Sequence, residues 1–399
     1  MFKRSLNHFL RVSLRGIRLS STKTTPQSSL PAAYYRGGTS RAVFFKTSDL
    51  PASRSDWAPI FRGVVGSPDP YGRQLDGLGG GISSLSKVCV VGDSTHPDAD
   101  VDYTFAALGI RDSDVDFSSN CGNMISAVGP FAVDSGVFSA VAKQGAGGDE
   151  DGDGSGNATV RIHNTNTGKV IHATFPVVDG EAATSGDLAI DGVAGTAAPI
   201  QLDFINPAGS RTGKLLPTQG LKDVFDGAEV TCIDVANPCV FVKASDLGVS
   251  GTLTPDEITD TPGLLDRLDS IRRQAGVKMG LGDKLENVPG SVPKIGLVST
   301  PAGDEVGKVD LVVRALSVGQ PHKAVPITVA LALATAARLE GSTVHDVASG
   351  KKVASAGITI GHASGSILVG AMFGEKGGLE YATVFRTARR LFEGRVFWK

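Results

Sequence analysis

The chain has 399 residues, a formal net charge of −2 and 51 glycines, and only 6% of its residues are aromatic. This length predicts a globular protein of about two domains. A nucleic-acid surface usually carries a basic face, so the near-neutral charge argues against a nucleic-acid partner. No apolar run is long enough to span a bilayer, and the best candidate, 327–337, is short, rich in alanine and typical of a buried helix. We therefore expect no membrane partner.

Cysteine and acidic residues offer no clear metal site. The four cysteines lack Cys-x-x-Cys spacing, which argues against a zinc site or a disulfide framework and fits a reducing compartment: Cys89, Cys121, Cys232 and Cys239. The acidic loop 149–154 imitates the first half of a calcium-binding loop, but Val160 stands where the bidentate glutamate belongs. We expect no bound metal.

The first 29 residues differ in composition from the rest of the chain. They contain lysines and arginines, and the first acidic residue of the chain is Asp49. Apolar residues such as Phe2 and Phe9 fall on one helical face, and Arg4 and Arg11 fall on another. This composition predicts a mitochondrial transit peptide and hence a matrix protein, with the cytoplasm as the alternative location. A disordered basic tail is the simpler interpretation.

The remainder of the chain contains two copies of one plan, as an internal repeat would. Each copy has a polar turn, a strand ending in Lys-x-Ser-Asp-Leu, a helix, two strands, a small-residue helix and a strand–turn–strand. The matched segments are 35–50 with 234–247, 54–65 with 264–275, 86–91 with 293–298, 101–108 with 309–316, 121–133 with 322–339, and 160–178 with 358–373.

This repeat predicts an α+β fold of two halves, 30–222 and 223–399. The helices expected at 121–133 and 322–339 are apolar all round, which is typical of a helix buried inside its half. Their N-termini would lie on facing walls of a cleft between the halves. Clefts between domains are common ligand sites.

Two residues stand out as candidates for proton transfer. Cys121 begins one of these helices, where unpaired N–H groups and the helix dipole attract anions and favour a thiolate; Asn120 is expected to cap the helix. Lys87 follows a Gly/Ser loop at the start of a strand, where an amine can accept or donate a proton. The simpler interpretations are a small buried cysteine and a strand-end lysine whose head group reaches the surface.

Two glycine-rich turns at strand ends are candidates for holding carboxylates. They are Arg36-Gly-Gly-Thr-Ser40 and Gly361-His-Ala-Ser-Gly365, which offer N–H groups, hydroxyls and charge. His322-Lys323 would add anion contacts at the second helix start. The simpler interpretation is two tight turns that need glycine. The cluster at 77–81 matches no nucleotide-binding motif, and the chain has no Gly-x-Ser-x-Gly nucleophile motif.

At these residues the sequence resembles the PrpF family. That family includes 2-methylaconitate cis-trans isomerase, methylitaconate Δ-isomerase, 4-oxalomesaconate tautomerase and aconitate Δ-isomerase. The resemblance runs from about Tyr34 to Ala371 through five motifs in order: Arg36-Gly-Gly-Thr-Ser40, Ser86-Lys87, Asn120-Cys-Gly-Asn123, Asn237-Pro238 and Gly361-His-Ala-Ser-Gly365.

The resemblance implies the diaminopimelate-epimerase-like fold, in which each of two pseudo-symmetric halves is a sheet rolled around a central helix. In that fold the C-terminal strand can return to the first half. The resemblance also implies chemistry without a cofactor, with Lys87 and Cys121 facing the substrate. Two departures from the family pattern are the lack of a second cysteine near His322 and the presence of Arg41 where a lysine is expected.

We therefore expect an isomerase that moves an allylic proton in a small di- or tricarboxylate, with 2-methylaconitate or aconitate as the best candidates and a homodimer as an assembly to test. A 4-oxalomesaconate-type tautomerase and a non-catalytic carboxylate-binding accessory protein of a dehydratase are the alternatives. Lys87 and Cys121 are the expected catalytic residues. The expected substrate-binding residues are Arg36, Thr39, Ser40, Ser86, Gly122, Asn123, Asn237, His322, Lys323, His362, Ser364 and Gly365.

Overall fold

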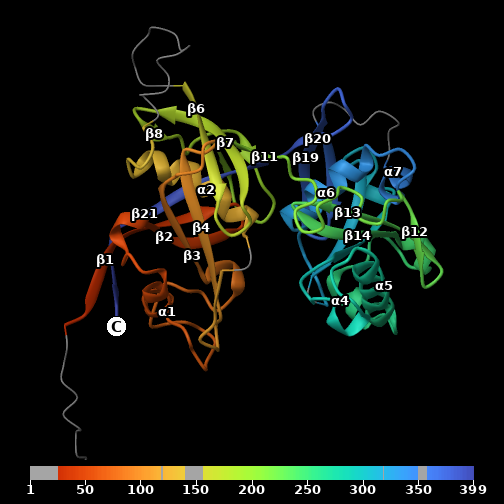
Figure 1. Ribbon diagram of the computed structural model, residues 1–399, viewed down its shortest axis with the longest axis horizontal. Helices are drawn as coiled ribbons and strands as arrows, with labels where there is room; N and C mark the ends of the chain where they lie inside the picture. Colours follow the sequence, from red (N-terminus) through yellow and green to blue (C-terminus); the bar gives the residue numbers. More distant parts are fainter. Residues whose placement is uncertain (1–25, 118–119, 140–155, 318, 349–356) are drawn as a thin grey trace, which may run out of the picture.

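The computed structural model describes residues 26–117, 120–139, 156–317, 319–348 and 357–399. Figure 1 shows two lobes, each with strands around a central helix. The sequence features at 1–25 and in the acidic loop 149–154 lie outside the described residues. Residues 28 and 29, which the sequence had placed in the leader, instead belong to the first strand.

The helices are short, and most pack against sheet faces. They are α1 (Trp57–Val65), α2 (Gly122–Asp134), α4 (Pro255–Asp260), α5 (Leu264–Lys278), α6 (Ile327–Ala337) and α7 (Thr343–Val347). No helix in the described ranges is long and apolar enough to cross a membrane. Nor do three or more His, Cys, Asp or Glu side chains gather there in a way that could hold a metal ion.

The first lobe takes its strands from both ends of the chain. They are β1 (Ser28–Gly37), β2 (Ser40–Lys46), β3 (Lys87–Asp93), β4 (Val101–Leu108), β5 (Val115–Asp116), β6 (Gly156–Asn164), β7 (Lys169–Val178), β8 (Glu181–Ala182), β9 (Leu188–Ala189), β10 (Thr196–Ala197), β11 (Ile200–Ile205) and β21 (Ala388–Trp398).

The second lobe is built from the intervening residues. Its strands are β12 (Asp223–Phe225), β13 (Ala228–Val235), β14 (Asn237–Lys243), β15 (Lys294–Ser299), β16 (Leu311–Ser317), β17 (Gln320–Pro321), β18 (Ile358–His362), β19 (Gly365–Phe373) and β20 (Leu379–Arg386).

The two lobes repeat one strand order. The first runs β21-β1-β2-β3-β4-β6-β7-β11, and the second runs β12-β13-β14-β15-β16-β18-β19-β20. Parallel pairs occupy the same two places in each order, β2–β3 with β14–β15 and β4–β6 with β16–β18. Antiparallel pairing of β11 with β20 joins the two sheets. The expected internal repeat is thus present in the strand pairing.

One continuous core runs through both lobes. Side chains of α2 and α6 are buried almost throughout, as the lack of charge in these helices predicted. The more amphipathic helices α1 and α5 instead cover the outer faces of the sheets, each with its own apolar cluster. The sheets therefore have a buried helix on one face and an outer helix on the other. The starts of α2 and α6 meet, with Gly122 packed against Ile327.

Candidate active site

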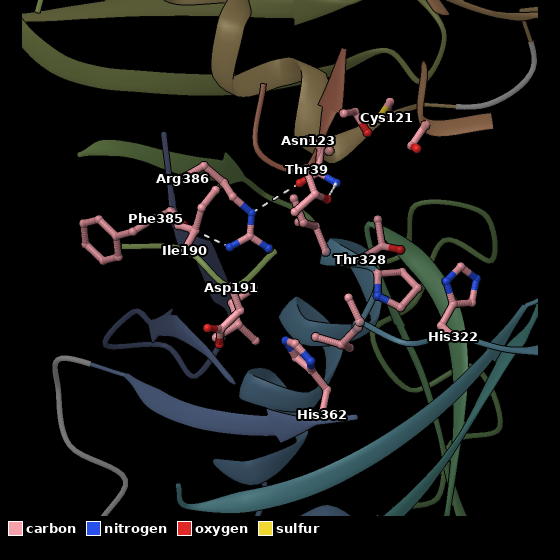
Figure 2. A pocket seen from close by; sticks show the side chains of 18 of the residues that line it. Thr39, Cys121, Asn123, Ile190, Asp191, His322, Thr328, His362, Phe385 and Arg386 are labelled. Carbon is pink, nitrogen blue, oxygen red and sulfur yellow. Dashed lines mark hydrogen bonds between the residues drawn. The ribbon is translucent and has the colours of Figure 1, made fainter. Parts of the chain in front are cut away.

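A cavity of about 910 Å³ lies where the two lobes meet. Its walls come from the starts of α2, α6, β3 and β15, from the ends of β18 and β20, and from the chain around β9. Figure 2 shows side chains from both lobes converging on it, with Cys121, Asn123 and Thr39 on one side and His322 and His362 on another. This size suits a small ligand.

The starts of the two buried helices touch each other at this cavity. A Cβ added to Gly122 would lie 2.9 Å from Cβ of Ile327, so only a glycine allows this approach. Cys121 is the N-cap residue of α2, and no side chain caps the helix. The predicted Asn120 cap is wrong, because Asn120 Oδ1 instead accepts a hydrogen bond from Asn164 Nδ2 at 2.9 Å. The first turn of α2 therefore faces the cavity without a side-chain acceptor.

The second helix begins later than expected. α6 starts at Ile327 with Pro326 as its N-cap residue, again without a side-chain cap. A residue before proline favours an extended backbone, which keeps the helix from extending back through Val325 to His322. His322 follows β17, and its N–H donates to the Ala315 carbonyl at 2.8 Å. His322 still lines the cavity, but it does not stand at the helix start.

Lys87 lies in the cavity wall as the first residue of β3. It is only 8% exposed, and its Nζ lies 5.1 Å from the centre of the Phe105 ring, a cation–π contact. Burial raises the pKa of the neighbouring Cys89 thiol, and the charges of Cys121 and Lys87 both act on it. Lys87 and Cys121 therefore both line the cavity from the first lobe.

Lys294 also lines the cavity, although the sequence interpretation did not select it. Lys294 is the first residue of β15 and pairs with Cys239 of β14. Lys87 has the matching position in the first lobe, because it is the first residue of β3 and lies beside Ala42 of β2. Burial lowers the pKa of Lys294, the nearby Arg211 lowers it further, and Cys239 opposes the shift. The repeat alignment of 86–91 with 293–298 already contained this signal.

Arg386 is a second residue that the sequence interpretation missed. It is the last residue of β20, and its guanidinium points into the cavity (Figure 2). Burial lowers the pKa of Arg386 to about 10, so the group stays charged at neutral pH. Its sequence neighbourhood, a strand end far from the five motifs, gave no signal for a site.

Each helix start is tied to a strand end of its own lobe. Asn123 Nδ2 of α2 donates to Thr39 Oγ1 at 3.0 Å, and Asn237 Nδ2 of β14 donates to Thr328 Oγ1 of α6 at 3.3 Å. Asn123 and Thr328 are both the second residue of their helix. In the first lobe the helix therefore supplies the amide and the strand end supplies the hydroxyl, whereas in the second lobe the helix supplies the hydroxyl and the strand supplies the amide. These four residues line the cavity, as do Ser40 and Gly122.

Arg36 and Ser86, two of the predicted substrate-binding residues, are not among the residues that line the cavity. Arg36 Nη1 donates to the carbonyls of Gly38 and Thr387, each at 3.0 Å, so it holds the turn that carries Thr39. Ser86 is buried, and its hydroxyl donates to Gln74 Oε1 at 2.7 Å. The polar groups of both side chains are hydrogen-bonded to protein atoms. Both residues therefore stabilise the segments that carry neighbouring site residues.

Three predicted residues near the second lobe also lie outside the cavity lining, namely Lys323, Ser364 and Gly365. Ser364 Oγ donates to the Lys323 carbonyl at 3.0 Å. A Cβ at Gly365 would collide with the Asp191 carboxylate, which accepts a hydrogen bond from the Ser366 N–H. The glycine in this motif therefore makes room for Asp191, which lines the cavity and comes from the chain between β9 and β10.

His362 lines the cavity at the end of β18 and is buried. Burial lowers the pKa of His362; Arg386 and Arg314 act in the same direction, whereas the Asp191 carboxylate opposes it. Its Nδ1 accepts a hydrogen bond from the Ser364 N–H at 3.3 Å. The imidazole is thus neutral at physiological pH and is held in place by the Gly361–Gly365 turn.

The charges that line the cavity favour anionic ligands. Lys87, Lys294 and Arg386 are the lysines and arginines of the lining, and none forms an ion pair with a carboxylate of the described residues. Asp191 is the one carboxylate in the lining, and a backbone N–H engages it. With two uncapped helix starts added, the cavity can bind several carboxylates and hold a developing negative charge.

Comparison with known proteins places this chain among isomerases. The family model described as "PrpF protein" matches residues 27–399. The 3-methylitaconate isomerase of Eubacterium barkeri is 40% identical over 93% of this chain and 97% of its own length. The 2-methyl-aconitate isomerase of Shewanella oneidensis is 36% identical, with coverage of 95% and 99%. The 4-oxalomesaconate tautomerase of Pseudomonas putida is 38% identical, with coverage of 93% and 96%.

A solved structure shows the same architecture. The crystal structure of methylitaconate-delta-isomerase superimposes with a TM-score of 0.82 at 38% identity, covering 94% of this chain and 96% of that one. The expected α+β class and the diaminopimelate-epimerase-like plan of two rolled sheets are confirmed by this match and by the strand order above.

Proposed function

The chain belongs to the PrpF family and is an isomerase, and on that premise we propose that it moves an allylic proton and double bond in an aconitate-type tricarboxylic acid without a cofactor. The observation that carries this proposal is the cavity itself. Lys87 and Cys121 both line it beside two uncapped helix starts, among cations that no described carboxylate neutralises.

The proposed reaction begins with removal of a proton from the carbon next to the C=C bond. Lys87 takes the proton in its neutral amine form and becomes an ammonium, and the C–H electron pair moves into the double bond and its attached carboxylate to give a dienolate-like anion. The N–H groups at the starts of α2 and α6 face this anion as its charge develops, which lowers the barrier because they need no reorganisation.

The proton then returns at the far end of the allyl unit, which shifts the double bond, or at the original carbon after rotation, which exchanges cis and trans. Cys121 and Lys294 are the proposed donors among the groups of the lining. Cys121 stands at the helix start, and Lys294 occupies the matching strand position of the other lobe. One proton leaves the substrate for Lys87 and one returns from the donor, so the substrate keeps its composition, and transfer of a proton from Lys87 to the donor restores the enzyme.

A second candidate, 4-oxalomesaconate-type tautomerisation, uses the same proton transfer on an acid that carries a keto group. The Pseudomonas putida relative, at 38% identity, favours keeping it in the test. A non-catalytic accessory role is disfavoured because the relatives cited above are named for isomerisation or tautomerisation. We also propose a mitochondrial location from the basic leader, to be tested by fractionation of cells expressing the full chain.

The test is proton NMR in D₂O with metal-free protein and three acids: cis-aconitate, 2-methylaconitate and 4-oxalomesaconate. Loss of the allylic signal together with a shifted or inverted double bond in one of the first two is the expected result. Turnover of 4-oxalomesaconate alone would favour the tautomerase. Silence on all three, with binding still seen by calorimetry, would contradict the proposed isomerisation of these acids.

A further inference from the structure

Arg386 lines the cavity and has no acidic partner at ion-pair distance among the described residues. Its Nη1 donates to the Phe385 carbonyl at 3.0 Å, and its Nε lies 3.4 Å from Asn123 Oδ1. No carboxylate of the described residues lies within ion-pair distance of it. By contrast, the buried Arg272 contacts the Asp269 carboxylate at 2.8 Å and the Pro289 carbonyl at 2.8 Å.

An enclosed guanidinium without a counter-ion is unfavourable because the protein replaces water without replacing the charge partner. In a cavity wall, such a group is well suited to an anionic ligand. Its planar edge matches a carboxylate, which it can bind through two parallel hydrogen bonds. Figure 2 shows the guanidinium directed toward the open part of the cavity, between Asn123 and Asp191.

The guanidinium is already oriented before a ligand arrives. Asn123 Nδ2 donates to Thr39 Oγ1 at 3.0 Å, which turns Asn123 Oδ1 toward Arg386. Gly38 leaves space for this amide, since a Cβ there would lie 2.3 Å from Asn123 Oδ1. A donor that is held in its binding orientation loses little freedom when it binds.

Arg386 lies at a different end of the cavity from the proposed proton-transfer groups. Figure 2 shows Arg386 well apart from Cys121, with Asn123 and Thr39 between them. The carboxylates attached to the double bond belong near Lys87 and Cys121, where the proposed proton transfer takes place. A group on Arg386 is therefore a more distant part of the substrate.

We propose that Arg386 binds the third carboxylate of the substrate and thereby selects tricarboxylates over dicarboxylates. This inference rests on the proposed function and adds the residue that sets the substrate class. The chemistry requires a carboxylate carried on the saturated arm of the unsaturated acid. A dicarboxylate with a methyl group in that place leaves Arg386 without a partner.

The test compares two acids that differ by this one carboxylate, cis-aconitate and citraconate. Calorimetry gives the Kd of each for the wild-type protein, for Arg386→Gln and for the control Arg389→Gln, which removes the same charge from an exposed position of β21. Arg386→Gln should weaken cis-aconitate binding by about 30-fold or more and citraconate binding by less than about threefold. Arg389→Gln should change neither Kd by more than about threefold.

An equal loss for both acids would overturn the inference, because Arg386 would then contact a shared carboxylate or support the fold. No loss for either acid, or no binding of either by the wild-type protein, would overturn it as well. If Arg386→Gln does not fold in a thermal scan, Arg386→Lys keeps the charge without the two-pronged geometry. Arg386→Lys should raise the Kd for cis-aconitate about tenfold and leave the Kd for citraconate unchanged. Equal increases for both acids would overturn the inference.

The NMR assay separates this inference from the proposed function. Binding of cis-aconitate without isomerisation would contradict the function, whereas the binding difference between the two acids would still report on Arg386. Isomerisation by the wild-type protein, together with equal losses of affinity for both acids in Arg386→Gln, would uphold the proposed function and overturn the proposed selection of tricarboxylates.

Discussion

The two lobes share a strand order and a buried helix, yet they present different groups to the cavity. The first lobe offers Cys121 at the start of α2, and the second offers Pro326 at the start of α6. Both keep a lysine at the start of the matching strand, Lys87 or Lys294. The repeated frame therefore fixes where a group stands, and the residue at each place decides what that group can do.

The largest expected effect comes from the two lysines. Lys87→Met should lower kcat by about 10³-fold, since general base catalysis contributes about 10² to 10⁴ in rate. Lys294→Met should mainly raise KM, by about tenfold, through loss of one cation. Steady-state kinetics of both variants on the substrate found by NMR provides the measurement. An equal loss of kcat in both would show that the two lobes share proton transfer.

The contact between the helix starts provides a second test of the comparison. Gly122→Ala places a methyl group 2.9 Å from Cβ of Ile327, so the lobes must separate or the helices must shift. We expect a loss of about 1–3 kcal/mol in the free energy of unfolding, together with reduced activity. Denaturant unfolding gives the first quantity. Gly378→Ala is the matched control, because a Cβ there meets no atom within 4 Å; similar losses in both variants would contradict the contact argument.

Arg36 tests whether a motif residue acts on substrate or on the fold. Arg36→Gln removes three hydrogen bonds that tie the turn at Gly38 to Thr387, and it leaves the two carbonyls poorly satisfied. We expect a loss of about 1–3 kcal/mol in unfolding free energy, with KM changed by less than about threefold. A large rise in KM at unchanged stability would instead support the predicted role in substrate binding.

The smallest expected effect is a pH dependence of stability at His362. Because its folded-state pKa is lowered, chiefly by burial, the folded protein binds fewer protons than the unfolded chain below the unfolded pKa of about 6.5. Stability should therefore be constant with respect to this group above that value and fall as the pH drops through the folded pKa. Urea unfolding at several pH values should show that the free energy of unfolding falls less steeply with decreasing pH in His362→Gln than in the wild-type protein. The same pH dependence in both proteins would contradict this assignment.

Much of the fold could be predicted because the repeat and the hydrophobic pattern act over short distances. The strand–turn–strand expected at 160–178 appears as β6 and β7, and that at 358–373 appears as β18 and β19. The start of α6 was placed five residues too early, since an apolar stretch hides the effect of Pro326 on the residue before it.

The site was harder to predict than the fold. Thr39, Gly122 and Asn237 were found because they lie in turns and helix starts that motifs reveal. Arg386 and Asp191 could not be found, because only the packing of β11 against β20 and the path of the chain between β9 and β10 bring them to the cavity. Chemistry assembled from distant strand ends leaves no local pattern.

The strand order has a consequence for synthesis on the ribosome. In the second lobe, β12 and β13 are neighbours in sequence, so that edge can form as soon as the segment emerges. The matching edge of the first lobe pairs β1 with β21, which joins Ser28 to Trp398. The first lobe must therefore wait with β1 exposed until the last strand is translated, and long-range pairing of this kind is slow.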